Sequence, residues 1–236
     1  MEAIILAGGL GTRLRSRLSG VPKPMADIAG QPFLAILLDR LADSGISRVL
    51  LSVGYLSNVI VSYFGTAWRG MEIAYVLEDS PLGTGGAIRR ALADARAESV
   101  LILNGDTWLE TDYRVIMDFH NAQRATITMA ITWVEDRSRY GGVNIDEGRI
   151  TGFLEKGSNG PGWINGGIYA VTRDFPWPEG LANKFSFEND VLFPHLAHLP
   201  HAVYESKGYF LDIGLPEDLD RAQIELCSRD SRMDVG

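Results

Sequence analysis

Short apolar runs, separated by segments with helical spacing, make up the first half of the chain. The first run, residues 3–7, is continuous and closed by glycines, which is typical of a strand buried on both faces of a parallel sheet. Runs of the same kind cover residues 48–53, 73–77 and 100–103. Apolar residues at helical spacing occupy the segments 32–45, 57–64 and 87–95. This alternation predicts a mostly parallel sheet, whose ligands lie outside the carboxyl ends of the strands.

The hydrophobic pattern changes after residue 122, where runs rich in strand formers become frequent and helices become scarce. Strands are expected at residues 126–134, 143–145, 150–155, 164–171, 202–205 and 209–211. The tripeptide Asp146-Glu147-Gly148 has the chemistry of a hairpin turn. We therefore expect antiparallel strands that are added to the parallel sheet and build a second wall of a pocket, within one α/β domain.

Prolines and small polar residues mark where helices begin and end. Pro32 and Pro216 suit the first helical position, and the acids that follow Pro216 also favour a helix start. The residues expected to cap a helix are Ser57, Asp112 and Ser186. The short helix predicted at 187–193 is expected to stop at Pro194.

Composition narrows the kinds of partner. Of the 236 residues, 46% are hydrophobic, which supports one substantial core. The net charge of −8 argues against a nucleic-acid partner, which needs a clustered excess of Lys and Arg, but leaves a small anionic ligand open. Cys227 is the only cysteine, so no intrachain disulfide can form. The first residues lack a basic signal-peptide region, and no run approaches ~20 apolar residues, so we expect a cytoplasmic protein with no membrane partner.

The loop at residues 6–24 is basic within this acidic chain. Its glycines are Gly8, Gly9 and Gly11, and its cations are Arg13, Arg15, Arg17 and Lys23. Glycines let a ligand approach the backbone, and the prolines on both sides of Lys23 fix its position, so the loop is typical of a phosphate site. It is not a dinucleotide fingerprint, because Leu14 takes the place of the third glycine, and it is not a Walker loop.

Two aspartates are candidates for a metal site. Asp106 and Asp212 are 106 residues apart, but each follows an apolar strand, so both would lie at the same end of the sheet. Mg²⁺ prefers one or two carboxylates together with phosphate oxygens and water, which this pair and a nucleotide would supply. The alternative is that Asp212 only caps the turn into the last helix. Zinc is not expected at the three closely spaced histidines, because prolines interrupt the segment and no fourth ligand is near. They are His195, His198 and His201.

Six motifs, in order along nearly the whole chain, resemble the signature of the sugar-1-phosphate nucleotidylyltransferases. They are Gly8-Gly9-Leu10-Gly11-Thr12-Arg13-Leu14 with Pro22-Lys23-Pro24-Met25, Pro81-Leu82-Gly83-Thr84-Gly85-Gly86, Asn104-Gly105-Asp106, Glu155-Lys156, Asn165-Gly166-Gly167, and Asp212-Ile213-Gly214 with Pro216-Glu217-Asp218. Two positions depart from the family pattern, since no proline follows Leu14 and Gly157 stands where many relatives have proline. The resemblance implies a Rossmann-like three-layer sandwich, with a mixed, mostly parallel central sheet and added antiparallel strands.

Further motifs resemble the branch of this family that uses GTP and D-glycero-α-D-manno-heptose 1-phosphate for surface polysaccharide synthesis. They are Arg13-Leu14-Arg15-Ser16, Arg139-Tyr140-Gly141 and Lys184-Phe185-Ser186-Phe187-Glu188. The resemblance implies one nucleotidyltransferase domain over residues 1–236, with a nucleotide-binding half at about 1–122 and a sugar-phosphate-binding half at about 123–236. It also makes a homodimer possible.

The resemblance assigns roles to single residues. Arg13 would hold the pyrophosphate side of the nucleotide, Lys23 the α-phosphate and Lys156 the phosphate of the sugar, while Asp106 and Asp212 would hold Mg²⁺. The other nucleotide-binding candidates are Leu6, Ala7, Gly8, Gly9, Gly11, Thr12, Glu78, Gly83 and Thr84. The other sugar-binding candidates are Gly141, Glu155, Asn165 and Gly166, whose glycines would leave room for the sugar ring. No family role attaches to Arg15 and Arg17, which are expected on a solvated face.

Glu78 bears on the choice of nucleobase. A carboxylate at Glu78 could accept two hydrogen bonds, and guanine presents two adjacent donors, so this residue favours GTP; Asp79 is an alternative reader.

Three other functions stay open. They are a uridylyl-, thymidylyl- or guanylyltransferase acting on a hexose 1-phosphate such as mannose 1-phosphate, a silent regulatory subunit, and a glycosyltransferase. A silent subunit would be expected to have lost some of the charged site residues, all of which are present. A glycosyltransferase would usually carry Asp-x-Asp at the metal turn, where this chain has Trp108 two positions after Asp106.

Overall fold

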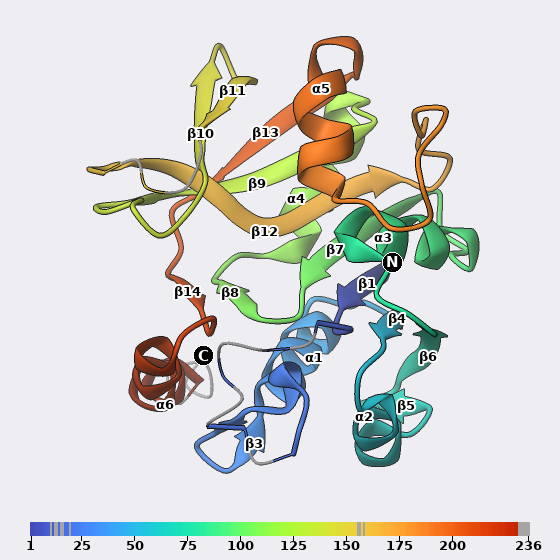
Figure 1. The fold of residues 1–236 in the computed structure, drawn as a ribbon, viewed down its shortest axis with the longest axis vertical. Helices are drawn as coiled ribbons and strands as arrows, with labels where there is room; N and C mark the ends of the chain where they lie inside the picture. Colours follow the sequence, from blue (N-terminus) through green and yellow to red (C-terminus); the bar gives the residue numbers. More distant parts are fainter. Residues whose placement is uncertain are drawn as a thin grey trace.

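The strands and helices of the first half alternate as the sequence predicts. The computed structural model describes residues 1–9, 11, 14, 17–18, 20–154, 157 and 159–230 (Figure 1). The strands are β1 (Glu2–Leu6), β4 (Arg48–Val53), β5 (Ala67–Trp68), β6 (Met71–Leu77) and β7 (Ser99–Asn104). The helices are η2 (Lys23–Met25), α1 (Phe33–Asp43), α2 (Ser57–Phe64), α3 (Gly83–Ala93) and α4 (Tyr113–Gln123). A short ribbon pairs β2 (Asp27–Ile28) with β3 (Gln31–Pro32).

The second half is dominated by strands. They are β9 (Ile127–Val134), β10 (Gly142–Asp146), β11 (Arg149–Leu154), β12 (Gly162–Thr172) and β13 (His201–Ser206). The helical segments are η3 (Glu188–Leu192), α5 (Phe193–His195), η4 (Leu196–His198) and α6 (Pro216–Asp230). A second ribbon pairs β8 (Thr107–Leu109) with β14 (Phe210–Asp212), so it joins the two halves of the chain.

Within the described residues, one sheet of ten strands runs through the molecule in the order β11-β10-β12-β7-β1-β4-β6-β5, with β9 between β12 and β13. The strands β7, β1, β4 and β6 are parallel neighbours. β12 is antiparallel to both β7 and β9, and it crosses the molecule between the two halves (Figure 1). This confirms the mixed α/β sheet, although β13 is parallel to β9 and is therefore an exception to the expected antiparallel additions.

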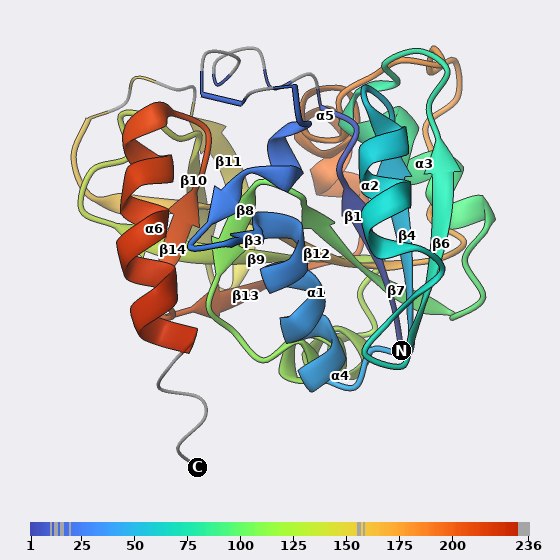
Figure 2. The ribbon, with the colours of Figure 1, turned by 90° about the horizontal axis from the view of Figure 1, so that it is seen from below.

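Helices cover both faces of the sheet and complete three layers (Figure 2). On one face α1, α2, α4 and α6 share a buried core that contains Leu37 and Tyr113. On the other face α3 and the segment from η3 to η4 share a second core, which contains Ile88, Phe187 and Leu192. The strands β1, β4 and β7 are buried on both faces, which explains their continuous apolar runs.

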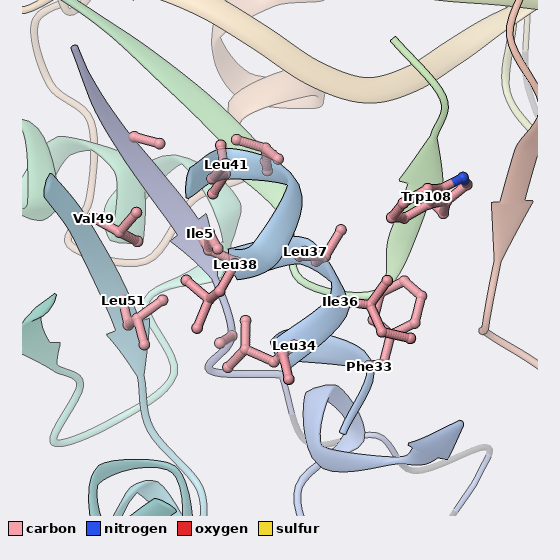
Figure 3. Close-up of a cluster of buried hydrophobic side chains, with 14 of the residues drawn as sticks. Ile5, Phe33, Leu34, Ile36, Leu37, Leu38, Leu41, Val49, Leu51 and Trp108 are labelled. Carbon is pink, nitrogen blue, oxygen red and sulfur yellow. The ribbon is translucent and has the colours of Figure 1, made fainter. Parts of the chain in front are cut away.

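Helix α1 shows how helical spacing becomes packing. Leu38 and Leu41 lie on the side of β1 and β4, whereas Phe33 and Ile36 lie on the side of Trp108 (Figure 3). All of these side chains are buried, and each contributes about 1.5–3 kcal/mol on leaving water. The helix therefore fixes the parallel strands and also the β8 ribbon beside the carboxyl ends of those strands.

Predictions of turns and caps had mixed outcomes. The hairpin prediction is confirmed, since Asp146 pairs with Arg149 and both turn residues, Glu147 and Gly148, have positive φ. The Asp112 cap is also confirmed, because its carboxylate accepts a hydrogen bond of 2.9 Å from the backbone N–H of Arg114.

Other predictions at helix ends were wrong. Pro32 precedes α1 as its N-cap, and Ser57 is the first residue of α2, whose N-cap is Leu56 in the left-handed conformation. Pro194 does not stop the helical segment after Ser186. The π-helix η3 ends at Leu192, and Pro194 falls in the first turn of the next helix, α5. The missing N–H of a proline costs little in a first turn. Across the described ranges, every helix is too short or too polar to span a membrane.

Candidate active site

The glycine loop and the metal turn meet where β1 and β7 end. The backbone N–H of Gly105 donates a 3.0 Å hydrogen bond to the carbonyl oxygen of Leu6. A side chain at Gly105 would lie only 2.6 Å from that oxygen, so glycine is required for this close approach. The turn thereby places Asp106 beside the loop, as expected for the carboxyl edge of a parallel sheet.

Asp106 and Asp212 converge on one lysine. The ribbon of β8 and β14 sets Asp212 opposite Thr107, and the N–H of Ile213 donates to the carbonyl of Asp106 over 3.0 Å. Lys23 Nζ lies 2.6 Å from Asp106 Oδ2 and 3.8 Å from Asp212 Oδ1. The lysine side chain is only 11% exposed. Residues far apart in the sequence therefore form one charged cluster.

The donor set of this cluster fits Mg²⁺. Both carboxylates reach a single point, occupied by the ammonium of Lys23, so both can reach one cation there. Within the described residues, no three or more His, Cys, Asp and Glu side chains gather as a metal cage. Two hard oxygen ligands, with the remainder from phosphate and water, match the preference of Mg²⁺. His201 is engaged by backbone groups instead, since its ring contacts the N–H of Ile150 and the carbonyl of Leu199.

One cavity of about 300 Å³ lies at the nucleotide side of the cluster. Its lining residues are Leu6, Gly8, Gly9, Glu78, Pro81, Gly83, Thr84, Ala87, Asn104 and Asp106. Two further nucleotide-binding candidates, Ala7 and Gly11, are not among these lining residues. Ala7 is buried and donates its N–H to Ser52 over 2.8 Å, while Gly11, with φ of 56°, packs against Lys23.

Glu78 forms part of the cavity wall and also holds it together. Its carboxylate accepts hydrogen bonds from the hydroxyl of Ser52 at 2.9 Å and from the N–H of Leu82 at 3.1 Å. A side chain at Gly8 would overlap Glu78 Oε1, which explains that glycine. Asp79 lines a neighbouring hollow of about 240 Å³. Each oxygen of Glu78 keeps a second acceptor site, so its role as a reader of the base stays a prediction.

The glycines at the start of α3 serve packing as well as a ligand. A side chain at Gly83 would overlap the carbonyl of Phe185, one at Gly85 the ring of Phe185, and one at Gly86 the carbonyl of Asn183. Backbone hydrogen bonds of 3.0 Å join Leu82 and Gly85 to Phe185. The segment 183–188 from the second half therefore lies directly against the loop that carries the predicted nucleotide-binding residues Gly83 and Thr84.

A larger cavity of about 850 Å³ lies on the other side of the cluster. Its lining residues are Asn104, Thr107, Tyr140, Gly141, Gly142, Val143, Phe153, Leu154, Asn165, Gly167, Ser186, Glu188, Asn189, Phe193, Phe210 and Asp212. Asn104 lines both cavities, and Asp106 and Asp212 line one each. The two cavities therefore meet at the charged cluster.

The sugar-side candidates differ in their placement. Gly141 and Asn165 line the larger cavity. Gly166 was expected to leave room for a sugar ring, but a side chain there would point at Leu109, 2.7 Å away, and at the carbonyl of Ala130. The reason is a bulge in β12, which turns Gly166 inward and Gly167 toward the cavity.

Two arginines form ion pairs with aspartates of α6. Arg17 forms an ion pair with Asp220, and its side chain is 47% exposed, so the expected position on a solvated face is confirmed for this residue. Arg139 forms two hydrogen bonds with the buried carboxylate of Asp218, and this pairing raises the pKa of Arg139. The adjacent Tyr140 lines the larger cavity, where burial raises the pKa of its phenol.

Several predicted residues lie outside the described part of the chain. They are Thr12, Arg13, Arg15, Glu155 and Lys156. The sequence interpretation also assigned no role to some polar cavity residues, namely Ser186, Glu188 and Asn189. Two of them, Ser186 and Glu188, belong to the motif at 184–188, whose resemblance to the family branch is the signal that could have indicated them.

Comparisons with known proteins identify relatives over nearly the whole chain. A model described as nucleotidyl transferase matches residues 2–229. The D-glycero-alpha-D-manno-heptose 1-phosphate guanylyltransferase of Aneurinibacillus thermoaerophilus is 43% identical over 226 residues, which cover 96% of this chain and 98% of that protein. The protein of the same name from Campylobacter jejuni is 42% identical, over 92% of this chain and 96% of that protein.

More distant relatives and solved structures extend the similarity. The mannose-1-phosphate guanylyltransferase of Mycobacterium tuberculosis is 37% identical over 96% of this chain but covers 64% of that protein. The crystal structure of HddC from Yersinia pseudotuberculosis superposes with a TM-score of 0.85 at 36% identity, covering 95% of this chain and 99% of that one. The crystal structure of HddC complexed with GMP-PN superposes with a TM-score of 0.83 at 35% identity, and it also covers 95% of this chain and 99% of that one.

Proposed function

The chain belongs to the nucleotidyl transferase family, and we propose that it transfers the guanylyl group of GTP to D-glycero-α-D-manno-heptose 1-phosphate with release of pyrophosphate. The observation that carries the proposal is the meeting of two cavities at Lys23, Asp106 and Asp212. A transfer between two substrates needs two binding spaces with one shared reaction point, because alignment supplies much of the rate. The names of two relatives, at 43% and 42% identity, support this substrate pair.

The chemistry needs few reactive groups from the protein. A phosphate oxygen of the sugar 1-phosphate forms a bond to the α-phosphorus of GTP. The bond from that phosphorus to the oxygen shared with the β-phosphate breaks, and pyrophosphate leaves. Because the attacking oxygen is already anionic, neither a nucleophilic side chain nor a general base is required. The main barrier is repulsion between anions, which fixed cations lower.

We assign the cation at the reaction point to Lys23, which lies where the two cavities meet. Its ammonium has three N–H donors, so it can contact an oxygen of the α-phosphate while it stays beside Asp106 and Asp212. Mg²⁺ held by Asp106 and Asp212 would offset the negative charge of the two carboxylates and would neutralise phosphate charge. Arg13 for the pyrophosphate and Lys156 for the sugar phosphate remain predictions.

Mannose 1-phosphate is the second candidate acceptor. It is favoured by the mannose-1-phosphate guanylyltransferase that is 37% identical to this chain. GTP would be the donor in both cases, and the complex of HddC with GMP-PN supports a guanine nucleotide. The choice between the sugars depends on the larger cavity, whose polar end carries Ser186, Glu188 and Asn189.

Pyrophosphate release from purified protein tests the proposal. The common ribonucleoside triphosphates are each combined with heptose 1-phosphate, mannose 1-phosphate and glucose 1-phosphate, with and without Mg²⁺. We expect release only with Mg²⁺ and fastest with GTP and the heptose compound. A preference for mannose 1-phosphate would make that sugar the acceptor in place of the heptose compound. Absence of pyrophosphate release with every pair of substrates would refute the proposed transfer.

A further inference from the structure

Glu188 joins the two cavities through hydroxyl groups. Its Oε2 accepts hydrogen bonds from Thr84 at 2.8 Å and from Ser186 at 3.1 Å, and its Oε1 accepts one from Tyr169 at 2.9 Å. The partners come from three different parts of the chain, namely α3, β12 and the segment before η3. The side chain also lines the larger cavity.

On the nucleotide side, Thr84 is fixed by this carboxylate. Thr84 is the second residue of α3 and lines the smaller cavity. Its hydroxyl donates to Glu188 and accepts a 2.9 Å hydrogen bond from the N–H of Phe187. A hydroxyl has one proton to donate, so the side chain of Thr84 has no donor left for a nucleotide, and only its backbone could contact one. Contacts with Phe187 and Glu188 of the second half therefore hold the start of α3 in place.

On the sugar side, the connection continues through Tyr169. This tyrosine is fully buried, its hydroxyl donates to Glu188, and it accepts a hydrogen bond from Nδ2 of Asn165. Oδ1 of Asn165 accepts a 2.9 Å hydrogen bond from the N–H of Gly167 across the bulge in β12. Burial and the charge of Glu188 raise the pKa of the Tyr169 phenol, which keeps its proton in place for this bond. The orientation of Asn165, which lines the larger cavity, thus depends on Glu188.

We propose that Glu188 is a positioning residue that couples the two substrate sites, because it holds Thr84 beside the nucleotide and the Tyr169–Asn165 pair beside the sugar at the same time. The inference rests on the proposed two-substrate transfer. Only a carboxylate accepts hydrogen bonds on both of its oxygens, whereas an amide has one acceptor oxygen and would set its NH₂ group against one set of hydroxyls. Loss of the charge at Glu188 therefore loosens both sites together.

Steady-state kinetics of Glu188→Gln test this coupling, with Asp190→Asn as the matched control. Asp190 is an exposed acid two residues away, whose carboxylate accepts a hydrogen bond from the N–H of Ser186 and lies outside both cavity linings. We expect Glu188→Gln to raise KM for both substrates by about fivefold or more, a change typical of a lost coupling. Asp190→Asn should leave both KM values within about twofold of wild type, as expected for a surface substitution.

Two further variants separate coupling from simple support and do not rely on the folding of Glu188→Gln. Thr84→Val removes the nucleotide-side hydroxyl, and Tyr169→Phe removes the sugar-side hydroxyl. Coupling through Glu188 predicts crossed effects, since Thr84→Val should raise KM for the sugar phosphate and Tyr169→Phe should raise KM for the nucleotide. The double variant should then show a non-additive change in both constants.

The outcomes distinguish this inference from the proposed function. The kinetics use whichever substrate pair the wild-type protein turns over fastest, so a wrong choice of sugar or base leaves the comparison intact. If each single variant changes KM only for the substrate on its own side, Glu188 does not couple the sites. Failure of the transfer itself would be seen in wild-type protein as absent pyrophosphate release, before any variant is compared.

Discussion

The two halves of the molecule build their parts of the site by different means. In the first half, Gly105 and Asp106 lie directly after β7, and short loops at the sheet edge carry the smaller cavity. In the second half, the cavity residues include Asn165 and Gly167 at the bulge in β12, and Ser186 and Glu188 of the segment 183–188, which packs against α3. A local pattern therefore specifies the first wall, whereas long-range packing specifies the second.

The strongest test of this comparison uses the charged cluster of Lys23, Asp106 and Asp212, to which both halves contribute. Asp106→Asn and Asp212→Asn should each lower kcat/KM by about 10²–10³-fold, because each removes one of the two carboxylates proposed to hold the Mg²⁺ that neutralises phosphate charge. Both variants should also need more Mg²⁺ for half-maximal activity, measured by titrating Mg²⁺ in the pyrophosphate assay. Equal losses would mean that the two halves share one metal site.

The control for these variants is Asp146→Asn, at the exposed end of β10, directly before the two-residue turn of the β10–β11 hairpin. Asparagine is well tolerated in such a turn, so activity and thermal stability should be unchanged. Undiminished activity in Asp106→Asn would remove that residue from the metal site. A loss confined to Asp106→Asn would assign the metal to the first half alone.

The second test compares two glycines of the second half that have different surroundings. A methyl group at Gly166 would meet Leu109 at 2.7 Å and the carbonyl of Ala130 at 3.0 Å, whereas the nearest atom at Gly141 is 3.5 Å away. Gly166→Ala should lower the free energy of unfolding by about 1–3 kcal/mol through overpacking, and urea unfolding measures this change.

Gly141→Ala is the matched variant and should behave in the opposite way. Its unfolding free energy should stay close to wild type, while KM for the sugar phosphate should rise, because this position lines the larger cavity. If Gly166→Ala left stability intact and raised KM instead, the inward orientation assigned to Gly166 would be wrong. The pair of variants thus separates a glycine needed for packing from one needed for ligand space.

Sequence reasoning was most successful where one residue type has one physical use. The buried strands, the turn at Asp106 and the cap at Asp112 all follow from neighbours in the sequence. The convergence of Asp106 and Asp212 could also be predicted, because strand ends of one sheet share an edge. The inward orientation of Gly166 could not be predicted, because the direction in which a residue beside a bulge points depends on the register shift in β12.

Glu188 illustrates the same limit for a functional side chain. Its partners Thr84 and Tyr169 lie 104 and 19 residues away, and no local spacing connects the three positions. Gly83 is a predicted nucleotide-binding residue, yet Gly83, Gly85 and Gly86 also make room for Phe185 and Asn183. Glycine-rich loops can serve a ligand and a distant segment at once, and only the folded chain reveals the second use.

The smallest expected effect concerns a polar link between the halves. His120 of α4 is buried, and its Nδ1 lies 3.0 Å from the hydroxyl of Thr128 in β9. Burial lowers the pKa of His120 below its ordinary value, because the charged imidazole is poorly solvated there. As the pH falls below about 6.5, the unfolded chain takes up a proton that the folded chain resists, so the free energy of unfolding decreases.

Urea unfolding of wild type and His120→Gln between about pH 8 and pH 5.5 measures this contribution, which changes by at most about 1.4 kcal/mol per pH unit for one histidine. Glutamine can keep a polar contact with Thr128 but does not titrate, so the stability advantage of wild type should shrink as the pH falls. A growing advantage at low pH would mean that the folded state favours the charged ring. Because Thr128 belongs to β9, that result would mean that the contact between α4 and β9 stabilises a charged imidazole.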